Sequence, residues 1–315
     1  SPVNVVKPYI ESMNLPRLAQ LNEKVANYAA KCLRPPWVEA LKIGYWERAW
    51  DWDQNAAYAN ALAVLPDWRL GKWKQGPYQE KAALGYVRCD YEIFPEVTCH
   101  PIIEDAPGGG RAAVGVHRDR YLTKGQIDFI RQWKIGTVDV IDGVWWFPER
   151  IVQPMKTTVA RLVRQRGELA MAGDAVLAGY LAKRVLAGLW GYIARWDWKA
   201  GKEPDPLFNP VWAAEITTLI PMRNADLIYR RKLMKSVISV TVDGFLCDKN
   251  PGGIEAGWKL SGEGPALVLS ASQSWFGDKR PDGKTLPEVL ALVKAAPGNN
   301  SWGWTFQRTA TLGDC

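Results

Sequence analysis

The spacing of apolar and polar residues changes within one stretch of the chain, residues 46–66. Over residues 46–53 the two kinds alternate, with three Trp on one face and Asp51 and Asp53 on the other, which predicts a β-strand. From Gln54 to Pro66 the sequence is rich in Ala with apolar residues at helical spacing, which predicts a helix. Asp53 therefore ends a strand beside a helix start, a usual place for metal or phosphate chemistry. The alternative is that Asp53 only caps the helix.

A second carboxylate lies in the segment 236–248, SVISVTVDGFLCD, which has the pattern of a β-hairpin. Alternation through the first strand predicts that Asp243 lies at the tip of this hairpin. Asp-Gly is also the commonest pair in tight turns, so the alternative is that Asp243 and Gly244 serve only as turn residues.

Helical spacing predicts several further helices. One begins at Asn14 and carries an apolar stripe through Tyr28. Another follows Thr123, which has the chemistry of an N-cap, and a long one covers residues 209–233 with a kink at Pro221. Apart from the helix after Thr123, residues 68–148 have the alternation of a sheet.

Two consecutive helices are predicted over residues 157–170 and 175–196, and both are basic. The first carries Arg166 and the second carries Lys183. This positive charge could be solvated on one side of the helices, or it could face phosphate groups.

The composition is that of a globular protein with one large or two ordinary domains: 315 residues, 47% hydrophobic and 23% charged. A formal net charge of +7 favours a polyanionic partner, although a slightly basic surface explains it equally well. Seventeen Trp are spread along the chain as core anchors or as platforms for bases.

The cysteines and histidines exclude some classes of protein. Five Cys without a CxxC pair and only two His argue against a zinc site or a disulfide framework, and they favour a reducing compartment. The sequence has no apolar run long enough for a membrane span and no signal peptide, so we expect no membrane partner. These features predict a cytoplasmic protein that is not secreted.

Taken together, three features predict phosphoryl or nucleotidyl transfer. Two carboxylates on adjacent strands, Asp53 and Asp243, can bind two divalent cations between them. A cationic helix around Lys183 can hold a triphosphate over that pair.

The same residues resemble the motifs of the family B DNA polymerases, in particular the divergent ones of viruses, plasmids and mobile elements. The family's DxxSLYP motif is similar to residues 53–59, its KxxxNSxYG motif to residues 183–191, and its DTDS hairpin to residues 241–244. The order and spacing of these motifs also match, and the resemblance runs from about Gly44 to Asp248, more loosely to Asp282.

Some positions depart from the family pattern. Thr241 stands at the first Asp of DTDS, while the second, the metal ligand in the family, is kept as Asp243. Ala187 and Gly188 replace Asn-Ser, Trp190 replaces Tyr, and Ala59 replaces Pro. The contacts to the nascent base pair must therefore differ from those of the family.

The resemblance implies an α/β (α+β) fold: a polymerase palm with an antiparallel catalytic sheet, inserted helical fingers and a short thumb. The implied segments are a helical lead-in over residues 1–45, palm over 46–153 and 201–255, fingers over 154–200, and a thumb-like region over 256–315. About 50 residues precede Asp53, too few for the proofreading exonuclease domain of the family. A separate exonuclease or other replication subunit is therefore an expected partner, in a host cell or at a nucleoid.

It also implies the roles of individual residues. Asp53 and Asp243 hold two Mg²⁺ or Mn²⁺ ions and are catalytic. Asp51, on the same strand face as Asp53, is either a further ligand or a solvated carboxylate. Lys183, Arg166 and Tyr58 bind the incoming deoxynucleoside triphosphate, against the alternatives of solvated cations and a buried aromatic ring. Residues expected to contact nucleic acid are Trp190, Lys235 and Lys279, with packing in the core as the alternative for Trp190.

The implied function is template-directed DNA synthesis, a nucleotidyl transfer from dNTPs to a primer 3′-hydroxyl on primer-template DNA. Two alternatives remain at this point. One is a catalytically inactive, polymerase-like palm that acts as a DNA-binding subunit of a replication complex. The other is an unrelated Trp-rich binding protein whose motif matches are accidental.

Overall fold

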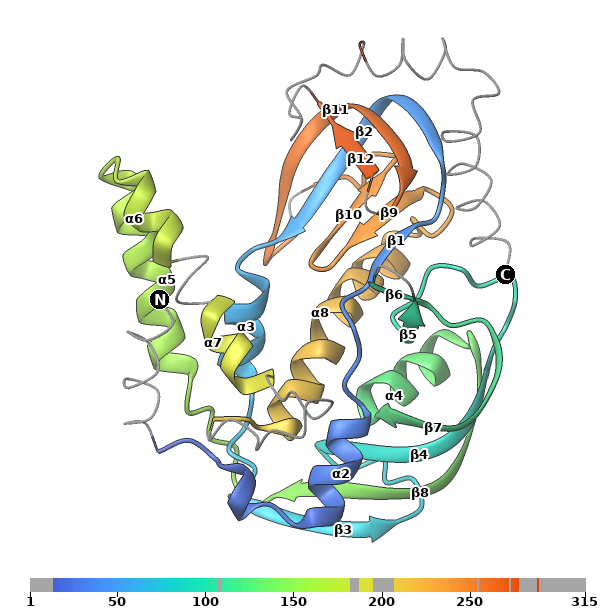
Figure 1. Ribbon diagram of the computed structural model, residues 1–315, viewed down its shortest axis with the longest axis vertical. Coiled ribbons are helices and arrows are strands. Elements are labelled where there is room, and N and C mark those ends of the chain that lie inside the picture. The colour runs from blue at the N-terminus through green and yellow to red at the C-terminus, as the bar shows by residue number, and fades with distance from the viewer. Residues whose placement is uncertain are drawn as a thin grey trace. The chain divides into compact units, whose positions relative to one another are not determined.

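The computed structural model describes residues 14–277, except 107–108, 182–186, 195–206, 254 and 272, together with residue 288. The chain forms two compact units, each built from separate segments of the sequence (Figure 1). Unit 1 comprises residues 1–33, 56–92 and 116–220, and unit 2 comprises residues 34–55, 93–115 and 221–315. The chain leaves unit 2 between β2 and α3, at residues 55–56, re-enters it for residues 93–115, and returns to it finally within the long helix α8.

Unit 2 is built on a six-stranded antiparallel sheet with the order β1-β9-β10-β2-β11-β12 (Figure 1). The strands are β1 Val38–Ala40, β2 Gly44–Gln54, β9 Val237–Thr241, β10 Gly244–Cys247, β11 Trp258–Ser270 and β12 Gln273–Phe276. The predicted strand lies within β2 and the predicted hairpin is β9–β10, so the antiparallel sheet expected from the sequence is confirmed. A two-stranded sheet, β5 Ile103–Ala106 with β6 Gly109–Ala112, completes the unit.

Small and β-branched side chains form a core on this sheet. Its buried members, from β1, β2 and β9 to β11, are Ala40, Ala49, Ile238, Leu246, Ala266 and Val268. Trp46 and Phe276 pack against this core. Trp50 and Trp52 of β2 are also buried. Along its second half the strand buries one face, that of Trp50, Trp52 and Gln54, while Asp51 and Asp53 on the other face stay partly exposed.

Unit 1 contains a four-stranded sheet with the order β3-β8-β4-β7. The strands are β3 Gly71–Gly76, β4 Leu84–Ile93, β7 Gly115–Thr123 and β8 Gly136–Pro148. Helix α4, Lys124–Trp133, begins at the predicted N-cap: the Thr123 hydroxyl accepts from the Gln126 backbone N–H, and the Gln126 side chain accepts from the Thr123 backbone N–H.

The first helix starts later than the sequence pattern predicted. After a short 3₁₀ turn, η1 Leu18–Gln20, the backbone at Leu21 is extended, and α2 covers Glu23–Lys31. Asn22 is the cap, because its Oδ1 accepts a 2.9 Å hydrogen bond from the Lys24 backbone N–H. The prediction that this helix begins at Asn14 is wrong.

The remaining helices of unit 1 are α3 Ala57–Val64, α5 Lys156–Met171, α6 Ala175–Tyr180 and α7 Ala187–Ala194. Asp174 caps α6 through a hydrogen bond from the Leu177 backbone N–H. Both α6 and α7 lie within the predicted second basic helix, and residues 182–186 between them lie outside the described residues.

Helix α8, Pro210–Arg230, begins with Pro at its first position, and the Asn209 side chain accepts from the Trp212 backbone N–H. It is apolar on nearly all sides and largely buried. Pro221 lies inside the helix, where the chain passes from unit 1 to unit 2.

This architecture does not decide the predicted division of the chain into segments. The division into palm, fingers and thumb segments stays a prediction. Strands β11 and β12 belong to the sheet of β2, and after residue 277 only residue 288 is among the described residues. None of the helices described is long and apolar enough to cross a membrane.

Candidate active site

Asp53 is a strand residue whose carboxylate does not cap the following helix. It is the last residue but one of β2, and α3 starts four residues later, at Ala57. The N-cap of α3 is Ala56, which has a left-handed backbone (φ 48°) and makes no side-chain cap. The alternative interpretation of Asp53 as a helix cap is therefore wrong, because an extended backbone continues past it to Gln54.

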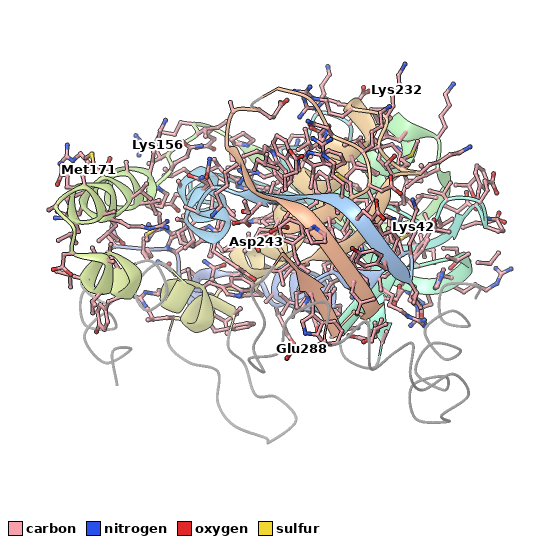
Figure 2. All side chains as sticks on the ribbon, turned by 90° about the horizontal axis from the view of Figure 1, so that it is seen from above. Lys42, Lys156, Met171, Lys232, Asp243 and Glu288 are labelled. Carbon is pink, nitrogen blue, oxygen red and sulfur yellow. The ribbon has the colours of Figure 1, made fainter. Side chains whose placement is uncertain are left out.

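Asp243 lies in the two-residue turn that joins β9 to β10. Thr241 and Gly244 pair across the turn, so Val242 and Asp243 are its central residues. Strand β10 runs antiparallel to β2 with Gly244 opposite Asp53, and the backbone O of Asp243 accepts a 2.9 Å hydrogen bond from the Gln54 N–H. The turn that carries Asp243 (Figure 2) therefore lies beside Asp53, at the same end of the sheet.

The turn is not an ordinary Asp-Gly turn. Val242, a β-branched residue, has a left-handed φ of 34°, a conformation that costs on the order of 1–3 kcal/mol. Gly244 is instead the first residue of β10, and a Cβ there would lie 2.6 Å from the backbone O of Trp52. Glycine is required because β10 approaches β2 closely beside Asp53. Gly244 is therefore a strand residue, while Asp243 does occupy the turn. The role of Asp243 beyond the turn stays a prediction.

The carboxylates of this site affect one another. Burial raises the pKa of Asp243, and the negative charge of Asp53 raises it further. Burial, together with the charge of Asp53, raises the pKa of Asp51 to about 6. Asp51 therefore belongs to the same concentration of negative charge.

Lys259 supplies the positive charge in this cluster, and sequence reasoning missed it. It lies on β11, on the other side of β2 from β10, with its Cα opposite that of Asp53. Its Nζ is 2.8 Å from Asp53 Oδ2, and half of its side chain is exposed. Nothing local in the sequence could have shown this contact, because it depends on how β11 pairs with a strand about two hundred residues earlier.

The predicted nucleotide-binding residues that the structure describes belong to unit 1. Tyr58 on α3 and Trp190 on α7 are partly buried, and their ring centroids are 5.8 Å apart at an angle of 33°. Arg166 is half-buried on α5, a helix that packs against α3. The structure therefore brings Tyr58 and Trp190 together, and both pack against the buried core of unit 1.

Three predicted lysines have different outcomes. Lys235 is exposed between α8 and β9, in unit 2. Lys183 and Lys279 lie outside the described residues, so their predicted roles are untested.

The donor atoms of the site suit a hard divalent cation. Two carboxylates supply the oxygen ligands that Mg²⁺ and Mn²⁺ prefer, and a cation between them would relieve the repulsion that raises the pKa of Asp243. Among the described residues, no group of three or more His, Cys, Asp or Glu is arranged to hold a metal ion. Asp53 and Asp243 could therefore supply two carboxylate ligands to a cation, and substrate and water would supply the others.

Solved structures with a similar fold were found. The chain aligns with Phi29 DNA polymerase in an orthorhombic crystal form with a TM-score of 0.64 and 14% sequence identity, over 90% of this chain and 56% of that one. Phi29 DNA polymerase complexed with primer-template DNA and incoming nucleotide substrates aligns with a TM-score of 0.61 and 14% identity, over 85% of this chain and 53% of that one.

The chain has a DNA-polymerase-like fold. It spans about half the length of the polymerases it matches. At this identity the likeness concerns the fold alone. No protein-family model matches the sequence. No curated protein matches it either.

Proposed function

We propose that this chain is a template-directed DNA polymerase that transfers nucleotides from dNTPs to a primer 3′-hydroxyl with two Mg²⁺ or Mn²⁺ ions. The observation that carries the proposal is the register of β2 and β10, in which Gly244 pairs with Asp53, so that the turn with Asp243 lies beside Asp53 at one end of an antiparallel sheet. This pair occurs in a fold similar to that of a DNA polymerase solved with primer-template DNA and incoming nucleotides.

The residues of the chain would divide the work as follows. Asp53 and Asp243 would hold the cations, and such ions would supply activation of the 3′-hydroxyl and neutralisation of charge on the triphosphate. Lys259 neutralises Asp53 through its 2.8 Å ion pair, so any cation that binds Asp53 competes with this lysine. The carboxylate cluster therefore has a built-in counter-charge.

The nucleotide and the DNA would be bound by residues outside this cluster. Lys183 and Arg166 would contact the triphosphate, and Tyr58, packed on Trp190, would lie under the sugar and favour deoxynucleotides. Lys235 and Lys279 would contact the phosphate backbone of the duplex.

Primer extension tests the proposal. The protein is incubated with a labelled primer-template, dNTPs and Mg²⁺, and Asp53→Asn and Asp243→Asn are compared with the wild type. Each substitution removes a ligand charge and should lower the rate by at least about a hundredfold. Asp248→Asn is the matched control, because Asp248 pairs with Lys42 near the opposite end of β2 and should leave the rate near that of the wild type (Figure 2).

The other outcomes separate the alternatives. A wild-type protein that binds primer-template but extends nothing, even at high protein concentration, would be an inactive DNA-binding palm. Absence of DNA binding would contradict both polymerase-related functions. Equal activity of the Asp53 and Asp243 variants and the wild type would contradict the proposed site.

A further inference from the structure

One buried amide, that of Asn224 on α8, connects the two segments that carry the carboxylates. Its Nδ2 donates to the backbone O of Val242 at 3.2 Å and approaches that of Gly244 at 3.4 Å, the residues on either side of Asp243. Its Oδ1 accepts a 2.7 Å hydrogen bond from the side chain of Gln54, the residue after Asp53. Asn224 is fully buried and Gln54 is 3% exposed.

These contacts fix the backbone of the turn from both sides. The N–H of Val242 donates to the backbone O of Trp37 at 2.8 Å, while its carbonyl accepts from Asn224. Asp243 itself accepts from the backbone N–H of Gln54. A left-handed valine persists only where its surroundings over-determine it, and these hydrogen bonds do so.

The arrangement has a consequence for the carboxylates. Asp53 and Asp243 repel each other, so the sheet must hold them near one another against that repulsion. Gln54 and the turn are joined to Asn224 and to each other within the buried interior, where hydrogen bonds are strong and costly to lose.

We infer that Asn224 is a positioning residue for the cation site: its side-chain amide, with Gln54, sets the separation of the Asp53 and Asp243 carboxylates. The inference rests on the proposed function, because it concerns the same pair of carboxylates. It assigns Asn224 no contact with substrate or metal.

The test is the affinity for Mn²⁺ without DNA or nucleotide, measured from free Mn²⁺ by electron paramagnetic resonance. Asn224→Leu keeps the size of the side chain but removes its donors and its acceptor. Mn²⁺ binding should weaken by about tenfold or more, as when the hydrogen-bond partners of metal ligands are removed. Asp53→Asn and Asp243→Asn identify which part of the Mn²⁺ binding belongs to this pair.

Thr218→Val is the matched control. Thr218 is a buried polar residue on the same helix, and its hydroxyl lies 3.2 Å from that of Thr123 in unit 1. Losing this hydrogen bond should lower the melting temperature as Asn224→Leu does, yet leave Mn²⁺ affinity unchanged. All measurements are made at a temperature where circular dichroism shows each variant folded.

A second variant tests whether Gln54 and Asn224 act together through their shared hydrogen bond. Gln54→Leu alone should weaken Mn²⁺ binding, and the double variant Gln54→Leu/Asn224→Leu should be scarcely weaker than Asn224→Leu, because both remove the same connection. Additive losses, or a Mn²⁺ affinity in Asn224→Leu equal to that of the wild type, would overturn the inference.

Enzyme kinetics keep this inference distinct from the proposed function. If the wild type extends primers, Asn224→Leu should lower kcat by about tenfold or more with little change in the KM for dNTP. If the wild type binds Mn²⁺ through Asp53 and Asp243 but extends nothing, the polymerase proposal fails while the Mn²⁺ comparison still decides the role of Asn224. If these carboxylates bind no Mn²⁺ at all, the inference is wrong.

Discussion

Single residues decide the charge balance of the candidate site. Asp53 has the negative Asp51 and Asp243 for neighbours and the ammonium of Lys259 in direct contact. The lysine reduces the repulsion among the carboxylates before any cation arrives, and it also lowers their attraction for a cation. Lys259 therefore stabilises the fold without a cation but weakens cation binding.

Replacing Lys259 should strengthen cation binding. Unit charges about 4 Å apart interact by about 1 kcal/mol in water, so Lys259→Met should raise Mn²⁺ affinity by about fivefold or more. Lys42→Met is the control, because it removes an ion pair of similar length, with Asp248, near the opposite end of β2. Weaker Mn²⁺ binding by Lys259→Met would mean that the lysine supports the site rather than competing for Asp53.

Gly244 should tolerate no side chain. A Cβ would meet the backbone O of Trp52 and force β10 away from β2, so Gly244→Ala should lower the free energy of unfolding by about 1–3 kcal/mol and weaken Mn²⁺ binding. Gly253→Ala is the control, since no atom lies within 4 Å of its added Cβ. Denaturant unfolding measures the first effect; a Gly244→Ala protein as stable as the wild type would contradict the close approach.

At the scale of elements, features set by residues close in the sequence were predicted well. Of the long-range pairings, only that between the strand of Asp53 and the hairpin of Asp243 was expected. The α4 start and the β9–β10 hairpin follow from residues within a few positions of one another, such as Thr123 and Gln126. The start of α2 was missed because Asn14 and Asn22 both have the chemistry of a cap, and only the extended backbone at Leu21 chooses between them. The partners of β2, and with them Lys259 and Asn224, depend on packing that no local pattern contains.

Helix α8 also carries a buried carboxylate that affects stability with pH. Glu215 accepts a 3.0 Å hydrogen bond from the Tyr86 hydroxyl of β4, and burial raises the pKa of Glu215 to about 7. The fold therefore favours the protonated acid. Ionising the buried Glu215 lowers the stability of the fold. This loss of stability is absent below the ordinary glutamate pKa, grows as pH rises from there to about 7, and is constant at higher pH.

Glu215→Gln should remove that loss of stability. The variant should gain stability over the wild type at pH 8, by at most about 3 kcal/mol, and gain little at pH 4. Tyr86→Phe removes the donor and should instead lose more stability at pH 8 than at pH 4. Urea unfolding at the two pH values measures both; a gain for Glu215→Gln that is the same at both would contradict the elevated pKa.

At the scale of the molecule, the formal net charge of +7 and the polymerase-like fold together predict that the affinity for DNA depends strongly on salt concentration. Six phosphate contacts would lower the affinity for primer-template by about a thousandfold between 50 and 200 mM salt. If Lys235 is one of the contacts, Lys235→Gln should reduce the slope of log affinity against log salt by about one. Fluorescence anisotropy checks this, and an unchanged slope would remove Lys235 from the interface.

The strands that pair in the sheet of unit 2 are synthesised at widely separated times. Asp53 pairs with Gly244 on one side and Lys259 on the other, so β2 is made long before either neighbour exists. At roughly 5–20 residues per second, the ribosome needs about 10–40 s to supply them. Throughout that interval the tryptophans of β2 lack the strands beside which they are later buried. The nascent chain is therefore most exposed to aggregation through the same strand that carries Asp53.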